Sequence, residues 1–125
     1  MNYQDLIDRI DNKLYPTEEL QLEAVKWYSG FICDIHNPSE KVQLEAVKQN
    51  IDAIKVIHKP SEKVQLIAVN ENGDALRYTH DPTEKVQLAA VKKDSYAIQF
   101  IHNPSKNLLK ELKKHFLSKK IKEHC

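Results

Sequence analysis

The sequence predicts an all-α protein: an α-solenoid of the right-handed type, with about four 22-residue two-helix repeats and a capping helix at each end. Two observations predict this fold. The five prolines stand at positions 16, 38, 60, 82 and 104, so they are 22 residues apart, and five of the six histidines follow the same period. The ten residues after Pro38, Pro60 and Pro82 are nearly identical (SEKVQLEAVK, SEKVQLIAVN and TEKVQLAAVK), and TEELQLEAVK after Pro16 is a diverged copy. A fixed period of about 20–50 residues is the signature of stacked repeats.

Each repeat begins with a helix of about 11 residues, whose start is marked by a proline and a capping residue. We expect Asn37 and Asp81 to be N-caps, with the proline at the first helical position and a glutamate at the third position that reaches back to the cap. Where another residue precedes the proline, Thr17 or Ser61 should cap the helix instead. A C-terminal cap is expected at the residues that follow these helices, which are Asn50, Asn72 and Asp94.

A second, shorter helix is expected in each repeat, for example over Asp52–His58 and Tyr96–His102. On a helical wheel, the mainly apolar positions of the first helix span an arc of about 200°, which is typical of a helix packed between two neighbours. At the centre of that arc we expect buried amides that bond to the inter-helix turn, to backbone or to the histidines, from Gln21, Gln43, Gln65 and Gln87. The expected inner faces of the second helices include Ala53, Ile54 and Ile57, and in the last copy Ala97, Ile98 and Ile101.

The chain is predicted to be a single domain over residues 1–125. Residues 1–14 should form an acidic N-terminal capping helix, residues 15–103 the repeats, and residues 104–125 a basic C-terminal capping helix. Residues 1–37 contain three basic and seven acidic residues, whereas residues 104–125 contain seven lysines and two glutamates. An acidic start and a basic end could stack head to tail, so self-association is one expectation.

The composition excludes several classes of protein. With 41% hydrophobic residues, 30% charged residues, 2 glycines and 5 prolines in 125 residues, the chain is not of the disordered class. The longest charge-free stretch in its first half, Trp27–Cys33, is far shorter than the about 20 residues of a transmembrane helix. The charged residues near Met1 predict that there is no secretory signal, and we expect no membrane partner. Two cysteines, Cys33 and Cys125, fit a reducing cytoplasm.

No catalytic residue, cofactor or metal is expected. Successive histidines of a regular array stand about 8–10 Å apart, whereas two zinc ligands must each lie about 2.0–2.1 Å from one ion. The serines lie at cap or turn positions, and Gly30 and Gly73 are isolated, so the sequence has no glycine-rich phosphate loop. Cys33 has no neighbour that would lower its pKa. The chain is therefore not predicted to be an enzyme.

The repeat resembles the short two-helix repeats of the leucine-rich repeat variant class and, more loosely, HEAT and armadillo repeats. The resemblance rests on the Asn-Pro-Ser-Glu start at Asn37 and on the copies of the unit that follows, over about residues 15–125. Similar repeats occur in bacterial and phage proteins. The resemblance implies a helical binding scaffold and identifies no partner. The cysteine-rich cluster-binding segment that the class can carry has no match here.

The residues that vary on a fixed surface of a repeat protein are its candidates for contact with a partner. On the second helices they lie at positions i, i+3 and i+4, which form one stripe. Because Tyr and Arg are enriched at interface hot spots, we expect partner binding at Lys55, Arg77, Tyr78, Tyr96 and Phe100. The alternative is that Val56, Tyr78 and Phe100 are packing residues. A secondary partner-binding cluster is Trp27, Tyr28 and Phe31, and its alternative role is to cover the N-terminal helix.

The predicted function is therefore a non-catalytic protein–protein interaction scaffold, an adaptor or an inhibitor. The alternative is a nucleic-acid-binding module that uses the lysines of the first helices and the basic C-terminal helix. Its expected contacts are Lys110, Lys113, Lys114, Lys119 and Lys120. The simpler interpretation of the lysines on the first helices is a solvated surface with weak ion pairs.

Overall fold

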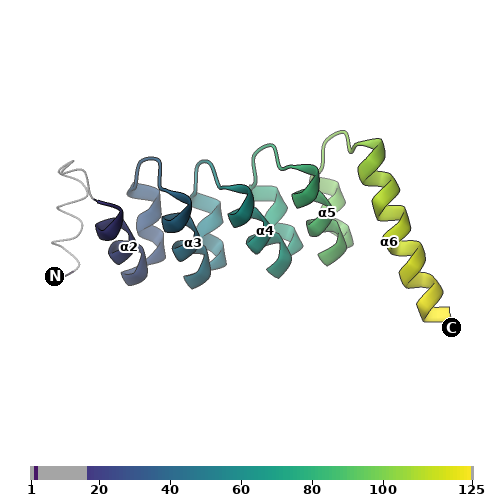
Figure 1. The fold of residues 1–125 in the computed structure, drawn as a ribbon, viewed down its shortest axis with the longest axis horizontal. Helices are drawn as coiled ribbons and strands as arrows, with labels where there is room; N and C mark the ends of the chain where they lie inside the picture. The colour runs from purple at the N-terminus through teal and green to yellow at the C-terminus, as the bar shows by residue number, and fades with distance from the viewer. Residues whose placement is uncertain (1, 3–16, 125) are drawn as a thin grey trace. The chain divides into compact units, whose positions relative to one another are not determined.

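The computed structural model describes residue 2 and residues 17–124, and within these the side chains up to residue 120. In this part of the chain, α-helices alternate with short 3₁₀ helices and no strand is present (Figure 1). The predicted N-terminal capping helix lies outside the described residues, apart from Asn2. The chain divides into two compact units, Met1–Val64 and Gln65–Cys125. The coarse prediction is confirmed: the protein is helical, and successive pairs of helices pack against one another within each unit.

The described residues of the first unit contain four complete helices and the start of a fifth. They are α2 (Glu18–Trp27), η1 (Ser29–Asp34), α3 (Glu40–Gln49), η2 (Ile51–Val56) and the first residues of α4 (Glu62–Glu71). Helix α2 packs against α3 and η1, and α3 also packs against both 3₁₀ helices. The two 3₁₀ helices contact each other, so α-helices and 3₁₀ helices form two adjacent rows.

The second unit repeats this arrangement and ends in a long helix. It contains the rest of α4, followed by η3 (Gly73–Tyr78), α5 (Glu84–Lys93), η4 (Ser95–Phe100) and α6 (Lys106–His124). Helix α5 packs against η3, η4 and α6, and η3 packs against η4. No 3₁₀ helix follows η4 in the described residues, because the chain continues as the 19-residue helix α6 (Figure 1).

The N-caps differ from the predicted ones. Ser39 caps α3 by accepting a hydrogen bond from the N–H of Val42 at 3.3 Å, and Thr83 caps α5 in the same way. Asn37 and Asp81 lie two residues before these caps, with φ of 49° and 48° in the left-handed region. The physical reason is that a residue before proline avoids the right-handed helical region, while Asn and Asp tolerate the left-handed one. The expected substitutes, Thr17 and Ser61, do accept hydrogen bonds from the N–H three residues later.

Two of the glutamates that follow a cap, Glu40 and Glu84, bond forward along the chain to a later cap. Ser61 Oγ donates to Glu40 Oε1 at 3.0 Å, and Ser105 Oγ donates to Glu84 Oε2 at 2.9 Å. Each hydroxyl also accepts a hydrogen bond from the backbone N–H of its own helix. One hydroxyl has a single proton and two lone pairs, so it can make both bonds at once. Ser61 and Ser105 are thereby each bonded to the first turn of the preceding α-helix in their unit.

The second helices are six-residue 3₁₀ helices. Each begins one residue earlier and ends two residues earlier than predicted. The residue between the two helices of a pair has two roles. The backbone N–H of Asn50 donates to the carbonyl oxygen of Ala46 at the end of α3, and its side chain accepts from the N–H of Asp52 at 3.0 Å. Asn72 and Asp94 do the same. The predicted C-caps are confirmed, and they also start the 3₁₀ helices.

The core of each unit consists of small and β-branched side chains of the α-helices and aliphatic side chains of the 3₁₀ helices. Ala46, Ala53 and Ile54 are buried as predicted. Ile98 is an exception, with 40% of its surface exposed. Its equivalent in the first unit, Ile32, is buried on η1, which η2 packs against. Ile98 lies on η4, which has no following 3₁₀ helix in the described residues, so its outer side stays uncovered.

Candidate binding grooves

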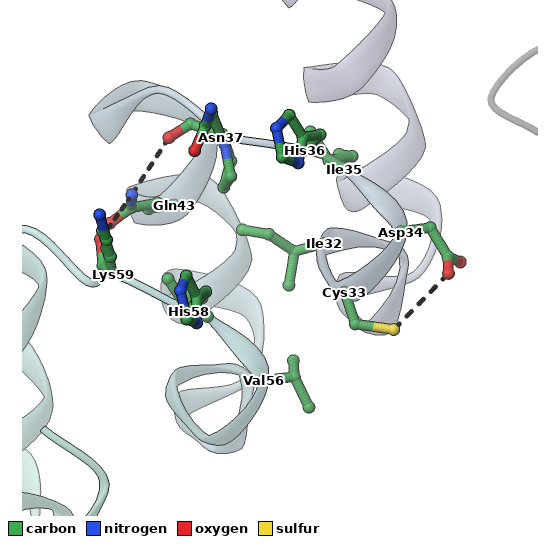
Figure 2. Close-up of a pocket in the computed structure, with 12 residues that line it drawn as sticks. Ile32, Cys33, Asp34, Ile35, His36, Asn37, Gln43, Val56, His58 and Lys59 are labelled. Atoms are coloured by element: carbon green, nitrogen blue, oxygen red, sulfur yellow. Dashed lines mark hydrogen bonds between the residues drawn. The ribbon is translucent and has the colours of Figure 1, made fainter. Parts of the chain in front are cut away.

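Buried glutamine amides fix the loops that precede the α-helices. In the first unit, Gln43 is buried and its Nε2 donates to the carbonyl oxygens of Pro38 at 3.1 Å and Lys59 at 3.3 Å. Its Oε1 accepts from the backbone N–H of Ser61 at 2.9 Å. Gln43 therefore joins two successive loops (Figure 2). In the second unit, Gln87 Nε2 donates to the carbonyl oxygen of Pro82 at 3.2 Å.

These glutamines contact loop backbone rather than the histidines. The histidine side chains of the loops, His36, His58, His80 and His102, are all exposed. Of the partners expected for the buried amides, the inter-helix turn is therefore the one present at Gln43 and Gln87. Because the loop backbone is held by side chains from the core, its position is set before any ligand arrives.

A groove of about 350 Å³ lies between η1 and η2 in the first unit. Ile32 on η1 and Val56 on η2 face the space between these two helices, and Gln43 lies at the end nearer the loops (Figure 2). The sides of the groove come from both 3₁₀ helices and from both loops that follow them. The complete lining is Ile32, Cys33, Asp34, Ile35, His36, Asn37, Pro38, Gln43, Val56, Ile57, His58 and Lys59.

A groove of about 470 Å³ lies between η3 and η4 in the second unit, at equivalent positions of the repeat. Its lining is Leu76, Arg77, Thr79, Asp81, Pro82, Gln87, Gln99, Phe100, Ile101 and His102. Most of these residues stand 44 positions, or two repeats, after a residue that lines the first groove. The proline, the glutamine and the histidine are the same in both grooves, as Pro38 and Pro82 illustrate.

The two grooves differ at their rims. In the first unit the variable positions carry Cys33, Asp34 and Val56, whereas the second unit has Arg77 and Phe100 at two of the corresponding positions. The two grooves therefore share a floor, which consists of the proline, the glutamine and the histidine. They differ in the charge and size of the residues at their rims. A binding site with this division can hold the same kind of chain in each groove and select different side chains.

Arg77 is the centre of the second rim. Its guanidinium carbon lies 5.5 Å from the ring centroid of Tyr78 and 5.4 Å from that of Phe100, which are cation–π distances. Its Nη1 lies 3.6 Å from Asp74 Oδ2, one turn earlier on η3. The side chain remains 51% exposed. The structure thus brings together three of the five predicted contact residues and orients the guanidinium between two aromatic rings.

The other two predicted contact residues do not take part in these ring contacts of Arg77. Tyr96 is at the start of η4 and is 77% exposed. Lys55 belongs to the first unit, where its Nζ lies 3.5 Å from Asp52 on the same 3₁₀ helix. Tyr78 and Phe100 are half-buried, so they both pack and present an edge to solvent. Sequence reasoning missed Thr79 and Asp81 as lining residues, because it considered the helix stripe and not the loops beside it.

The secondary cluster is divided between core and surface. Phe31 is 3% exposed and belongs to the core, so only Trp27 and Tyr28 are available to a partner. The Tyr28 and Phe31 rings meet edge to face, with centroids 5.7 Å apart. The N-terminal helix that this cluster was expected to cover lies outside the described residues.

Cys33 at the first rim is an exposed thiol with a raised pKa. Partial desolvation of the side chain is the largest cause, and the Asp34 carboxylate adds to it by its charge and by accepting a hydrogen bond from Sγ at 3.7 Å. Both effects favour the neutral thiol over the thiolate. The Cys33 thiol at the first rim therefore keeps its proton for the hydrogen bond to Asp34.

The lysines predicted to contact nucleic acid are exposed along α6. Lys114 and Lys119 line a groove of about 400 Å³ together with Lys92 of α5, and Lys110, Lys113 and Lys120 do not line it. In the described residues, no group of three or more His, Cys, Asp or Glu side chains is arranged to hold a metal ion. None of the described helices combines the length and hydrophobicity needed to cross a bilayer.

Comparisons with known proteins give no match: no family model, no curated protein and no solved structure is significantly similar to this chain.

Proposed function

We propose that this chain is a non-catalytic protein-binding scaffold, an adaptor or an inhibitor acting in the cytoplasm, that holds an extended segment of a partner protein in the grooves beside its 3₁₀ helices. The finer description of the fold belongs to the same proposal: a right-handed α-solenoid of four 22-residue repeats, similar to the leucine-rich repeat variant class.

One observation carries the proposal: the groove recurs at equivalent positions in both units, with the same floor and different rims. Packing alone requires the repeated core residues, and it does not require a recurring hollow. A floor fixed by the core loses little conformational entropy when a ligand binds. The recurring floor would contact the main chain of the partner, and the rims would select its side chains.

Arg77 at the second rim and Tyr78 beside it are of the residue types that dominate protein interfaces. Arg and Tyr are enriched at hot spots, where truncation of one side chain costs about 2 kcal/mol or more. Arg77 is held between Tyr78 and Phe100, so its side chain has less freedom to lose on binding. An acidic or aromatic side chain of the partner would fit beside it.

Affinity capture from a lysate of the source cell, with and without nuclease and read by mass spectrometry, tests this proposal. We expect one stoichiometric protein that nuclease treatment does not remove. The double variant Arg77→Glu with Tyr78→Ala should lose that protein and keep its helicity by circular dichroism.

The matched control is Lys48→Glu, which reverses one charge at an exposed position of α3 in the other unit. It should bind as the wild type does. Equal capture by the double variant and by the control would contradict the proposed surface. Recovery of this chain alone would favour self-association, and a catch that disappears with nuclease would favour nucleic acid.

A further inference from the structure

A cluster of lysines surrounds the junction of α5 and α6. Lys92 lines two separate grooves: one of about 400 Å³ with residues of α6, and one of about 350 Å³ along α5. The first also contains Lys114 and Lys119, and the second contains Lys85 and Lys93. Helices α5 and α6 pack against each other within the second unit, so these five cations belong to one surface.

Most of this positive charge is not compensated by carboxylates. Glu111 is the one acidic side chain that lines either groove, and it lies 3.6 Å from Lys114 Nζ. Among the described residues, no carboxylate forms an ion pair with Lys85, Lys92, Lys93 or Lys119. By contrast, Lys55 lies 3.5 Å from a carboxylate in the first unit. Clustered cations repel one another, and a bound polyanion relieves that repulsion.

The register of α5 places its lysines on one side. Lys85 and Lys92 are seven residues apart, which is close to two full turns and about 10 Å along the axis. Leu88 and Ala89 lie between them and complete the groove. The two lysines therefore point from the same face of the helix and can contact successive charges of an extended chain.

An aromatic pair on α6 includes one residue that lines this surface and its neighbour in the chain. His115 lines the groove between α5 and α6, and its ring meets Phe116 edge to face with centroids 5.1 Å apart. Phe116 is 38% exposed. Bases of single-stranded nucleic acid stack on exposed aromatic rings beside lysine-lined grooves, whereas the bases of a duplex are already stacked.

We propose that the face formed by α5 and α6 binds single-stranded nucleic acid, with its phosphates at the grooves that share Lys92 and a base stacked on Phe116. This site shares no lining residue with the protein-binding grooves. It therefore goes beyond the proposed function and does not depend on it. It also narrows the predicted nucleic-acid surface: of the lysines on the first helices, only those of α5 (Lys85, Lys92 and Lys93) are joined with α6.

The test is fluorescence anisotropy of a labelled 20-residue oligothymidylate, titrated with the full chain at several salt concentrations. If five lysines neutralise five phosphates, the slope of log K against log salt should be about −3.5, and affinity should fall about 100-fold between 50 and 200 mM salt. Lys92→Ala should reduce the slope to about −2.8, because one fewer counterion is released.

Lys48→Ala is the matched control. Lys48 stands at the position of α3 that Lys92 occupies in α5, two repeats later, and it is exposed in the same way. This variant should keep the wild-type slope. Phe116→Ala should weaken binding of the oligonucleotide and leave binding of inorganic polyphosphate unchanged.

Three results would overturn the proposal. One is the absence of binding at 50 mM salt, and another is an equal effect of Lys48→Ala and Lys92→Ala. The third is that a 20-base-pair duplex or polyglutamate binds as tightly as the oligonucleotide, with Phe116→Ala having no effect; the surface would then fit a duplex or an acidic protein segment. None of these results changes the outcome expected for Arg77, so the two proposals fail independently.

Discussion

Replacement of Gln43 by leucine tests whether the buried amide holds the two loops of the first unit together. The substitution removes three hydrogen bonds, to the carbonyl oxygens of Pro38 and Lys59 and from the N–H of Ser61. Each hydrogen bond contributes about 1 kcal/mol net. A buried leucine returns about 1 kcal/mol through its apolar surface. We therefore expect Gln43→Leu to lower the free energy of unfolding by about 2 kcal/mol.

Two matched substitutions set the scale. Gln87 makes one hydrogen bond, to Pro82, and is half-buried, so the loss and the gain in Gln87→Leu should cancel to near zero. Gln49 is exposed on α3 and bonds only weakly to Glu45, at 3.4 Å. Gln49→Leu should change the free energy of unfolding by less than about 0.5 kcal/mol.

The measurement is urea denaturation followed by circular dichroism at 222 nm, with the m-value checked for each variant. The reasoning predicts a clear gap between Gln43→Leu and the other two variants. If Gln43→Leu and Gln87→Leu have the same effect, the number of hydrogen bonds does not set the stability. If Gln43→Leu stabilises the protein, the amide serves another purpose.

Three further predictions concern single side chains. Gly73→Ala should lower the free energy of unfolding by about 1–3 kcal/mol, because the new methyl would lie 2.5 Å from a backbone oxygen of α5. Gly30→Ala should be tolerated, because the nearest atoms to its new methyl belong to the movable ring of Tyr28. Thermal unfolding compares the two variants. Ser105→Ala should lower the free energy of unfolding by about 1–2 kcal/mol, because it removes the cap of α6. An unchanged denaturation midpoint would contradict this. Asp34→Asn should lower the pKa of Cys33 and speed its reaction with iodoacetamide at pH 7.5 in a Cys125→Ser background; a slower reaction would show that the carboxylate does not raise that pKa.

The sequence was sufficient to predict the helices, their register and most of the core, because the 22-residue period aligns equivalent positions. The cap assignment failed at Asn37 because Asn and Ser are both good caps. A signal was present: the position of Ser39 holds Ser or Thr in every copy, whereas Lys59 occupies the position of Asn37 in one copy. The prediction that Ile98 is buried was wrong, because a repeat at the end of an array has different neighbours from a repeat inside it.

The site was predicted in part. The rim residue Arg77 followed from variation on a fixed surface, and its contacts with Tyr78 and Phe100 place it beside a groove. The grooves themselves depend on the distance between successive 3₁₀ helices and on the path of the loops, which a residue pattern does not contain. The lysines of the first helices, Lys92 among them, were part of the nucleic-acid alternative, but the groove that Lys92 lines with residues of α6 depends on how α6 packs against α5, which the residue pattern does not contain.

The bonds from the cap hydroxyls of Ser61 and Ser105 to an earlier glutamate have a consequence for how the gene can change. Ser61 is bonded to Glu40, and Ser105 to Glu84, through the same pair of groups 21 residues apart. The cap hydroxyl of a 22-residue repeat inserted in frame could donate to the glutamate of the repeat before it. The glutamate of the inserted repeat could accept from the cap hydroxyl of the repeat after it. Duplication or loss of 22 codons therefore alters the length of the protein without requiring a new interface. Recombination within a single gene could then change the number of grooves, and, under the proposed function, the length of the partner segment that they hold.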